Sequence, residues 1–131
     1  MNLNDITQWL KNVGNLRRLK SKDEWNRKKG LVGLGRYKNT TAIKAILPLL
    51  SDQSKFVRLG ALRALDKIGD RSVTDDLVPL LRDEWDVVAA TSAEILYRLG
   101  WEPQNASEAV SAAIAQVKHS PSRMLRDVHP K

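Results

Sequence analysis

The chain has 131 residues and a formal net charge of +7, from 22 Lys and Arg against 15 Asp and Glu. Hydrophobic residues make up 42% and aromatic residues 5%, a balance that favours a folded helical protein over a disordered or β-rich one. The absence of cysteine excludes disulfides and thiol chemistry, and the lack of a signal peptide or of an apolar run of roughly 18–20 residues makes a cytoplasmic location the expectation.

The first part of the chain predicts three helices. Over residues 4–20, apolar side chains recur at steps of three and four, which is typical of an amphipathic helix. Ser21 followed three residues later by Glu24 predicts a capping box, and so a second helix from about residue 22. Thr40 or Thr41 then predicts the start of a third.

Four further helices follow, so that about seven are expected in all. Polar residues that can cap a helix mark their starts, and these are Asp52, Ser72, Asp83 and Asn105. Gly69 and Gly100 are placed to end the fourth and sixth helices in the left-handed conformation that glycine accepts. Residues 120–131 contain two prolines and little periodicity, which indicates a flexible tail.

Two prolines fall inside predicted helices. Pro48 and Pro79 occupy equivalent positions in their segments, although a proline inside a helix costs about 3 kcal/mol or more. The pattern favours a bend shared by both helices over a helix that starts later.

The middle of the chain repeats itself at an offset of thirty-one residues. Residues 47–52 return as residues 78–83, and the same offset taken backwards pairs Phe56 with Trp25 and Arg58 with Arg27. A period of this length with helical spacing inside it predicts stacked helical hairpins. We therefore expect an all-α fold, a short α-solenoid over residues 1–119. Its expected parts are a capping helix 4–20 and units near 22–51, 53–82 and 84–118.

The repeats resemble a known family. The likeness is carried by residues 47–70, above all by the pairs Val57-Arg58 and Gly69-Asp70. These resemble HEAT-like repeats, in particular the short bacterial kind typified by phycobilisome-lyase HEAT-like repeats. The resemblance implies a ladder of Asp and Arg residues along the array, whose members here are Asp52, Arg58 and Asp83. It also implies a surface for a partner rather than a reaction site.

Nothing in the sequence predicts catalysis, a metal or a cofactor. The histidines, His119 and His129, lie near or in the expected tail, so no histidine–carboxylate pair is placed on a rigid element. Paired carboxylates such as Asp75 and Asp76 lie at helix starts, where negative charge interacts favourably with the helix dipole. We therefore expect a non-enzymatic interaction or scaffold module.

Two surfaces are candidates for partner binding. Residues 1–45 carry eleven Lys and Arg against three Asp and Glu, and such a density suits either an acidic protein or nucleic-acid phosphates, although much of it can be a solvated face. The candidate phosphate or nucleic-acid residues are Arg17, Arg18, Lys20, Lys22, Lys28, Lys29, Arg36 and Lys38. The candidate protein-partner residues, expected on the second helices of the hairpins, are Lys44, Asp75, Asp76, Arg82 and Trp85.

The positions of the four tryptophans predict different degrees of burial. Trp9 lies on the apolar stripe of the first helix and Trp25 occupies the place of Phe56, so both are predicted to be core residues, whereas Trp85 is predicted to be exposed. Trp101 is expected to cover the end of a hairpin. The second end of the array is less well covered than the first, which predicts a monomer or weak self-association. A third functional alternative, from the resemblance alone, is an accessory subunit related to phycobilisome lyases or degradation factors.

Overall fold

The computed structural model describes residues 2–128, with side chains described for residues 2–117. The chain divides into two compact units, Met1–Asp70 and Arg71–Lys131, which are described here one at a time. The secondary structure of the described residues is helical throughout, with α-helices α1–α7 and short 3₁₀ segments η1–η3. The prediction of an all-α fold with about seven helices is confirmed.

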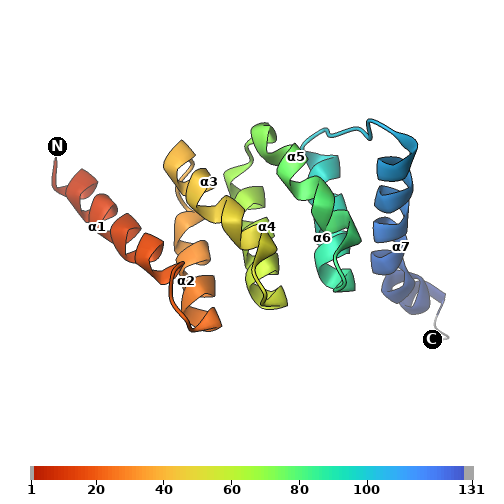
Figure 1. The fold of residues 1–131 in the computed structure, drawn as a ribbon, viewed down its shortest axis with the longest axis horizontal. Coiled ribbons are helices and arrows are strands. Elements are labelled where there is room, and N and C mark those ends of the chain that lie inside the picture. Colours follow the sequence, from red (N-terminus) through yellow and green to blue (C-terminus); the bar gives the residue numbers. More distant parts are fainter. Residues whose placement is uncertain (1, 129–131) are drawn as a thin grey trace. The chain divides into compact units, whose positions relative to one another are not determined.

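The first unit contains two antiparallel helical hairpins (Figure 1). Its elements are α1 (Leu3–Arg18), α2 (Glu24–Leu34), α3 (Thr40–Ile46), η1 (Leu47–Ser51) and α4 (Lys55–Ile68). The helix α2 lies between α1 and α4 and packs against both. Its Leu31 and Leu34 are almost fully buried, as are Leu62 and Leu65 of α4, and full burial of each such side chain contributes about 1.5–3 kcal/mol.

The hairpins are offset by one helix from the expected units. The principal partner of α2 is α1, and α3 with η1 pairs with α4. The reason lies in the repeat itself, because Leu16 and Leu19 precede Leu47 and Leu50 by one period. The helix α1 is therefore the first helix of a hairpin, where the sequence predicted a capping helix outside the first unit.

The helix starts in this unit differ slightly from those predicted. The N-cap residues are Asp23, Asn39 and Ser54, whose side chains accept the backbone N–H of Trp25, Ala42 and Val57. Ser21 and Asp52 instead accept the backbone N–H two residues ahead, at 3.2 and 2.9 Å. Short polar side chains favour such local turns as readily as caps, so Ser21 and Asp52 each lie two residues before the N-cap of the helix that follows.

The repeated prolines mark a change of helix type. Pro48 and Pro79 lie at the starts of η1 (Leu47–Ser51) and η3 (Val78–Arg82), each of which directly continues a short α-helix. A proline cannot donate the hydrogen bond that would continue the α-helix. A tighter 3₁₀ segment follows in both places.

The second unit repeats this plan and adds a long helix. Its elements are η2 (Arg71–Val73), α5 (Thr74–Leu77), η3 (Val78–Arg82), α6 (Asp86–Arg98) and α7 (Ala106–Val128). The helix α7 packs against α6 and η3, and the α5, η3 and α6 segments contribute fully buried side chains such as Leu77, Leu81, Ile95 and Leu96.

The ends of the helices in the two units test four of the predictions. Gly69 and Gly100 have φ of 74° and 79°, which confirms both as left-handed helix ends. Asn105 accepts the N–H of Glu108 at 2.9 Å, as a cap for α7 should. However, α7 extends to Val128 where a tail was predicted from residue 120. The helix therefore continues through Pro121, although a proline inside a helix removes one backbone donor.

Candidate functional site: a basic groove between α1 and α2

A groove of about 680 Å³ lies between the two helices of the first hairpin. Every residue that lines it comes from α1 or from the segment 25–37. The cationic lining residues are Lys11, Arg18, Lys28, Lys29 and Arg36, and the others are Gly14, Asn15, Trp25, Val32, Gly33 and Tyr37. No carboxylate is among them.

Helical periodicity places the cations in two rows. Lys11 and Arg18 are seven residues apart on α1, and Lys29 and Arg36 are seven residues apart on α2 and its C-terminal extension. Residues two turns apart share a helix face, with a separation of about 10.5 Å along the axis. The two helices run antiparallel (Figure 1), so each side of the groove carries two cations at a matching spacing.

Two glycines allow α1 and α2 to approach closely. Gly30 and Gly33 of α2 are opposite Asn15, which is 8% exposed. A Cβ atom added at Gly30 would lie 2.7 Å from the backbone oxygen of Asn15, and one at Gly33 would overlap the Asn15 side chain. A side chain at Gly30 would push against the backbone of α1, and one at Gly33 would displace the Asn15 side chain, so the two glycines fix the walls of the groove.

Among the residues that the structure describes, no carboxylate lines the groove beside its cations. The ion pair between Arg27 and Asp52 lies outside the groove. Within the groove, Arg18 donates a long hydrogen bond of 3.4 Å to Asn15 Oδ1, and the Lys28 ammonium lies 5.4 Å from the centre of the Trp25 ring. The groove therefore offers uncompensated positive charge together with an aromatic surface.

The prediction that Trp25 and Trp9 belong to the core is wrong. Trp25 is 51% exposed and Trp9 is 58% exposed. Trp25 stacks on Phe56, with ring centroids 5.8 Å apart, but Phe56 is itself 37% exposed. The repeat correctly equated the two positions, and both lie on the surface near the starts of α2 and α4.

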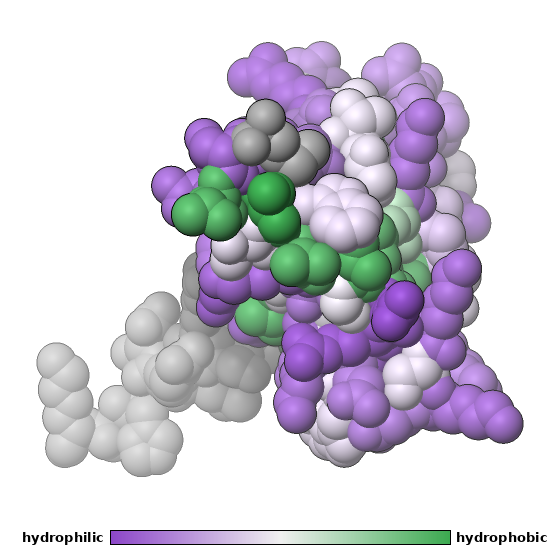
Figure 2. Space-filling view, turned by 90° about the vertical axis from the view of Figure 1, so that its left-hand side faces the viewer, coloured by the Kyte–Doolittle hydropathy of each residue, from purple (hydrophilic) through white to green (hydrophobic). Residues whose placement is uncertain are grey.

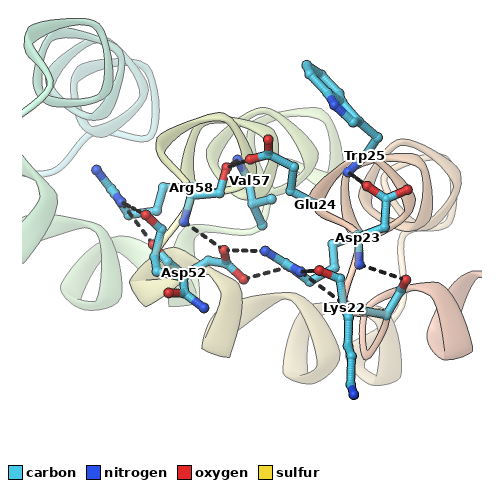
Figure 3. Close-up of polar contacts among 11 residues, drawn as sticks. Lys22, Asp23, Glu24, Trp25, Asp52, Val57 and Arg58 are labelled. Carbon is cyan, nitrogen blue, oxygen red and sulfur yellow. Dashed lines mark hydrogen bonds and ion pairs between the residues drawn. The ribbon is translucent and has the colours of Figure 1, made fainter.

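Beside the groove, Arg27 holds the two hairpins of the first unit together. Figure 3 shows the polar contacts around its partner Asp52, between Lys22 and Arg58. Its Nε and Nη2 donate to the Asp52 carboxylate at 3.0 and 3.1 Å, and its Nη1 donates to the carbonyls of Ser21 and Lys22. One period later, Arg58 donates to the carbonyls of Asp52 and Gln53 at 2.9 and 3.3 Å.

These contacts correct the predicted ladder. In the first unit, the carboxylate of Asp52 pairs with Arg27, whereas the resemblance offered Asp52 or Asp83 as the partner of Arg58. Arg27 was already the repeat equivalent of Arg58 in the sequence, so the missing partner was visible there. The part of the ladder that involves Asp83 stays a prediction.

The groove gathers half of the predicted phosphate-binding residues. Arg18, Lys28, Lys29 and Arg36 line it, whereas Arg17, Lys20, Lys22 and Lys38 are exposed elsewhere on the first unit. The sequence reasoning missed Lys11 and Val32. The seven-residue spacing from Lys11 to Arg18 is the signal that would have found Lys11.

The predicted protein-partner residues are placed differently. Lys44, Asp75 and Asp76 are exposed but belong to α3 and α5, which are first helices of their hairpins. Arg82 donates hydrogen bonds to the hydroxyls of Ser111, at 2.8 Å, and Ser107, so it attaches η3 to α7.

Trp85 is a half-buried residue at the start of α6. Its backbone N–H donates to Asp83 Oδ1 at 2.9 Å. Trp85 is therefore less exposed than the sequence suggested, and its role as a partner anchor stays a prediction. Trp101, expected to cover a hairpin end, is also half-buried.

Comparison with known families identifies the architecture. A family model described as HEAT repeats matches residues 14–97, which is more than half of the chain. The chain belongs to the HEAT-repeat family. HEAT repeats generally serve as scaffolds for protein–protein interaction. The phycobilisome-lyase subtype of the resemblance stays a prediction, and no curated protein matches the sequence.

Two further features bear on function. No helix among the described residues is long and apolar enough to span a membrane, and no group of acidic or histidine side chains there is arranged to hold a metal ion. The side chain of His119 and all of His129 lie outside the described part of this HEAT-repeat chain.

Proposed function

We propose that the chain is a non-enzymatic interaction module that binds an acidic segment of another protein in the basic groove between α1 and α2. The observation that carries the proposal is the lining of the groove, with five cations and no carboxylate. Charge complementarity of this kind guides a partner to one site and fixes its orientation there. Membership of the HEAT-repeat family supports a protein partner.

The groove also offers apolar contact, which a purely solvated charged face would not. Val32 is 53% exposed and Trp25 is 51% exposed, and both line the groove. Exposed tryptophan and arginine are the side chains that most often dominate binding energy at protein interfaces. A partner that combines acidic and apolar side chains would use both features.

The test compares two double variants of equal net charge. Lys29→Glu with Arg36→Glu changes the groove, and Lys20→Glu with Lys38→Glu changes exposed lysines outside it. Binding of fluorescein-labelled poly-glutamate is followed by anisotropy at several salt concentrations. We expect the groove variant to bind at least tenfold more weakly than the unmodified chain and the control variant to bind within about threefold of it. Equal losses would show that only net charge matters and would overturn the proposal.

A second candidate function is the binding of single-stranded nucleic acid. Exposed aromatic side chains in a basic groove are the combination used for such ligands, because bases stack on the rings while phosphates contact the cations. Trp25 beside Lys28 provides that combination here. The same two variants, tested with labelled oligo(dT), decide between the two candidate ligands. If the oligonucleotide binds, the groove variant weakens that binding and poly-glutamate does not bind, the ligand is a nucleic acid.

A further inference from the structure

The surface of the first unit offers an apolar patch as well as the groove. Figure 2 looks onto the side of the molecule where α1 lies and shows apolar side chains among hydrophilic ones. The exposed apolar residues of α1 are Leu3, Ile6, Trp9 and Leu10. Nothing in the structure shows what covers this patch, so it carries no proposal by itself. The groove carries one, because its charges and shape together specify an occupant.

We propose that the segment bound in the groove is an α-helix with acidic side chains seven residues apart and apolar side chains between them. It would lie along α1 and α2 as a third helix. This inference rests on the proposed function, and it names the conformation and the sequence pattern of the partner segment.

The spacing of the cations matches a helical partner. Lys11 and Arg18 are seven residues apart on α1, which corresponds to about 10.5 Å along the helix axis. On the other side, Lys29 of α2 and Arg36, two residues beyond the end of α2, are also seven residues apart. Acidic residues at positions i and i+7 of a partner helix have the same separation on one face. Each carboxylate can then lie near a cation from both sides of the groove.

The floor of the groove suits the close approach of a helix. A Cβ atom added at Gly14 would have nothing within 4 Å, so the surface there is open. Gly33 and the exposed Val32 continue this floor on α2. Small residues let helix axes approach to about 8–10 Å, and apolar partner residues at i+3 and i+4 would then contact Val32.

The groove offers no free backbone groups with which an extended partner could form hydrogen bonds. Extended peptides gain affinity by adding to a sheet edge, where backbone donors and acceptors are unpaired. The walls here are the helices α1 and α2, whose interior backbone groups already form their own hydrogen bonds. A helical partner also satisfies its backbone internally, so only its side chains need to complement the groove.

The test uses three labelled peptides of about 20 residues and identical composition. The first has Glu at i and i+7 with Leu at i+3 and i+4 in an alanine-rich helix, the second has the same residues in scrambled order, and the third has a D-amino acid at a central alanine to break the helix. We expect the first to bind at least tenfold more tightly than the other two. We also expect its circular dichroism to show helix gained on binding.

A variant of the protein tests the floor of the groove. Gly14→Leu fills open space and leaves the core unchanged, so folding should persist, and thermal melting checks this. We expect it to weaken binding of the helical peptide at least tenfold, whereas Lys20→Leu, which is exposed and outside the groove, should bind within about threefold of the unmodified chain.

The outcomes separate the two proposals. If all three peptides bind alike and Lys29→Glu with Arg36→Glu weakens all of them, the groove binds acidic segments but the helical partner is wrong. If none binds, or if that variant changes nothing, the proposed function fails as well. If only oligo(dT) binds in a groove-dependent way, the partner is a nucleic acid and this inference is overturned.

Discussion

Arg27 and Asp52 form a two-point ion pair between the two hairpins of the first unit. Their four atoms meet at 3.0 and 3.1 Å, and both side chains are only 13% exposed. The same guanidinium also holds the carbonyls of Ser21 and Lys22. One side chain therefore connects the start of α2 to the loop that precedes α4.

Replacing either partner should destabilise the protein. Arg27→Ala would leave the Asp52 carboxylate and two carbonyls without their donor, and we expect a loss of about 2–4 kcal/mol in the free energy of unfolding. Asp52→Ala should lose about 1–3 kcal/mol, because the carbonyl contacts of Arg27 remain. Urea denaturation of the two single variants and the double variant gives the coupling energy. A coupling below about 0.3 kcal/mol would contradict the role assigned to the pair.

Alanine at Gly30 should disturb the packing of α1 on α2. The added methyl group would meet the Asn15 backbone oxygen at 2.7 Å, and a backbone atom cannot move aside, so we expect a loss of about 1–3 kcal/mol. Gly14→Ala is the matched control. It lies within α1 with nothing within 4 Å, and should stabilise the protein by about 0.5–1 kcal/mol because alanine favours helix. Thermal denaturation measures both, and a stabilising Gly30→Ala would show that the helices are not in close contact.

Because Trp25 is exposed, replacing it should reduce binding more than it reduces stability. Trp25→Ala should lower the free energy of unfolding by only about 1 kcal/mol, from the lost ring contact with Phe56, while it weakens binding of the acidic helical peptide. Leu31→Ala, at a site that is 0% exposed, should lower it by about 2–5 kcal/mol. Chemical denaturation of both variants decides between a surface and a core position. If Trp25→Ala lowers the free energy of unfolding as much as Leu31→Ala does, Trp25 is a core residue and its assignment to the surface is wrong.

Arg82 should matter for the attachment of α7. Arg82→Ala removes donors from Ser107 and Ser111, and we expect a loss of about 1 kcal/mol. The loss should appear as faster amide hydrogen exchange in α7. Asp76→Ala, at an exposed position of α5, should leave exchange in α7 unchanged. If exchange in α7 is the same in both variants, these hydrogen bonds do not hold the helix.

The helices were predictable from the sequence because apolar spacing decides which faces are buried. The stripe of α4, with Leu62 and Leu65, was evident and both residues are buried. The starts of helices were less predictable. Ser21 and Asp52 are good capping residues, but Asp23 and Ser54 lie two positions later and are equally good. Local preference alone does not choose between neighbours of the same kind.

The groove was only partly predictable. A density of cations showed that the first hairpin is basic, but the antiparallel pairing of α1 with α2 determines which cations face each other. Lys11 was therefore absent from the predicted phosphate-binding residues. Lys20 and Lys22, in the connection between α1 and α2, were among them although they do not line the groove. Trp25 was misplaced because the comparison with Phe56 assumed that Phe56 is buried. Exposure at that repeat position depends on tertiary packing that spacing does not reveal.

The contact of Gly30 and Gly33 with Asn15 also affects how a ligand would bind. Because Gly30 meets the backbone of Asn15 and Gly33 meets its buried side chain, with no side chain of either glycine in between, the cavity keeps its form before anything enters it. On binding, conformational entropy would then be lost mainly by the ligand and by a few surface lysine and arginine side chains. Preorganisation of this kind predicts that stiffening the ligand, for instance by a hydrocarbon staple, would increase affinity more than adding further negative charge.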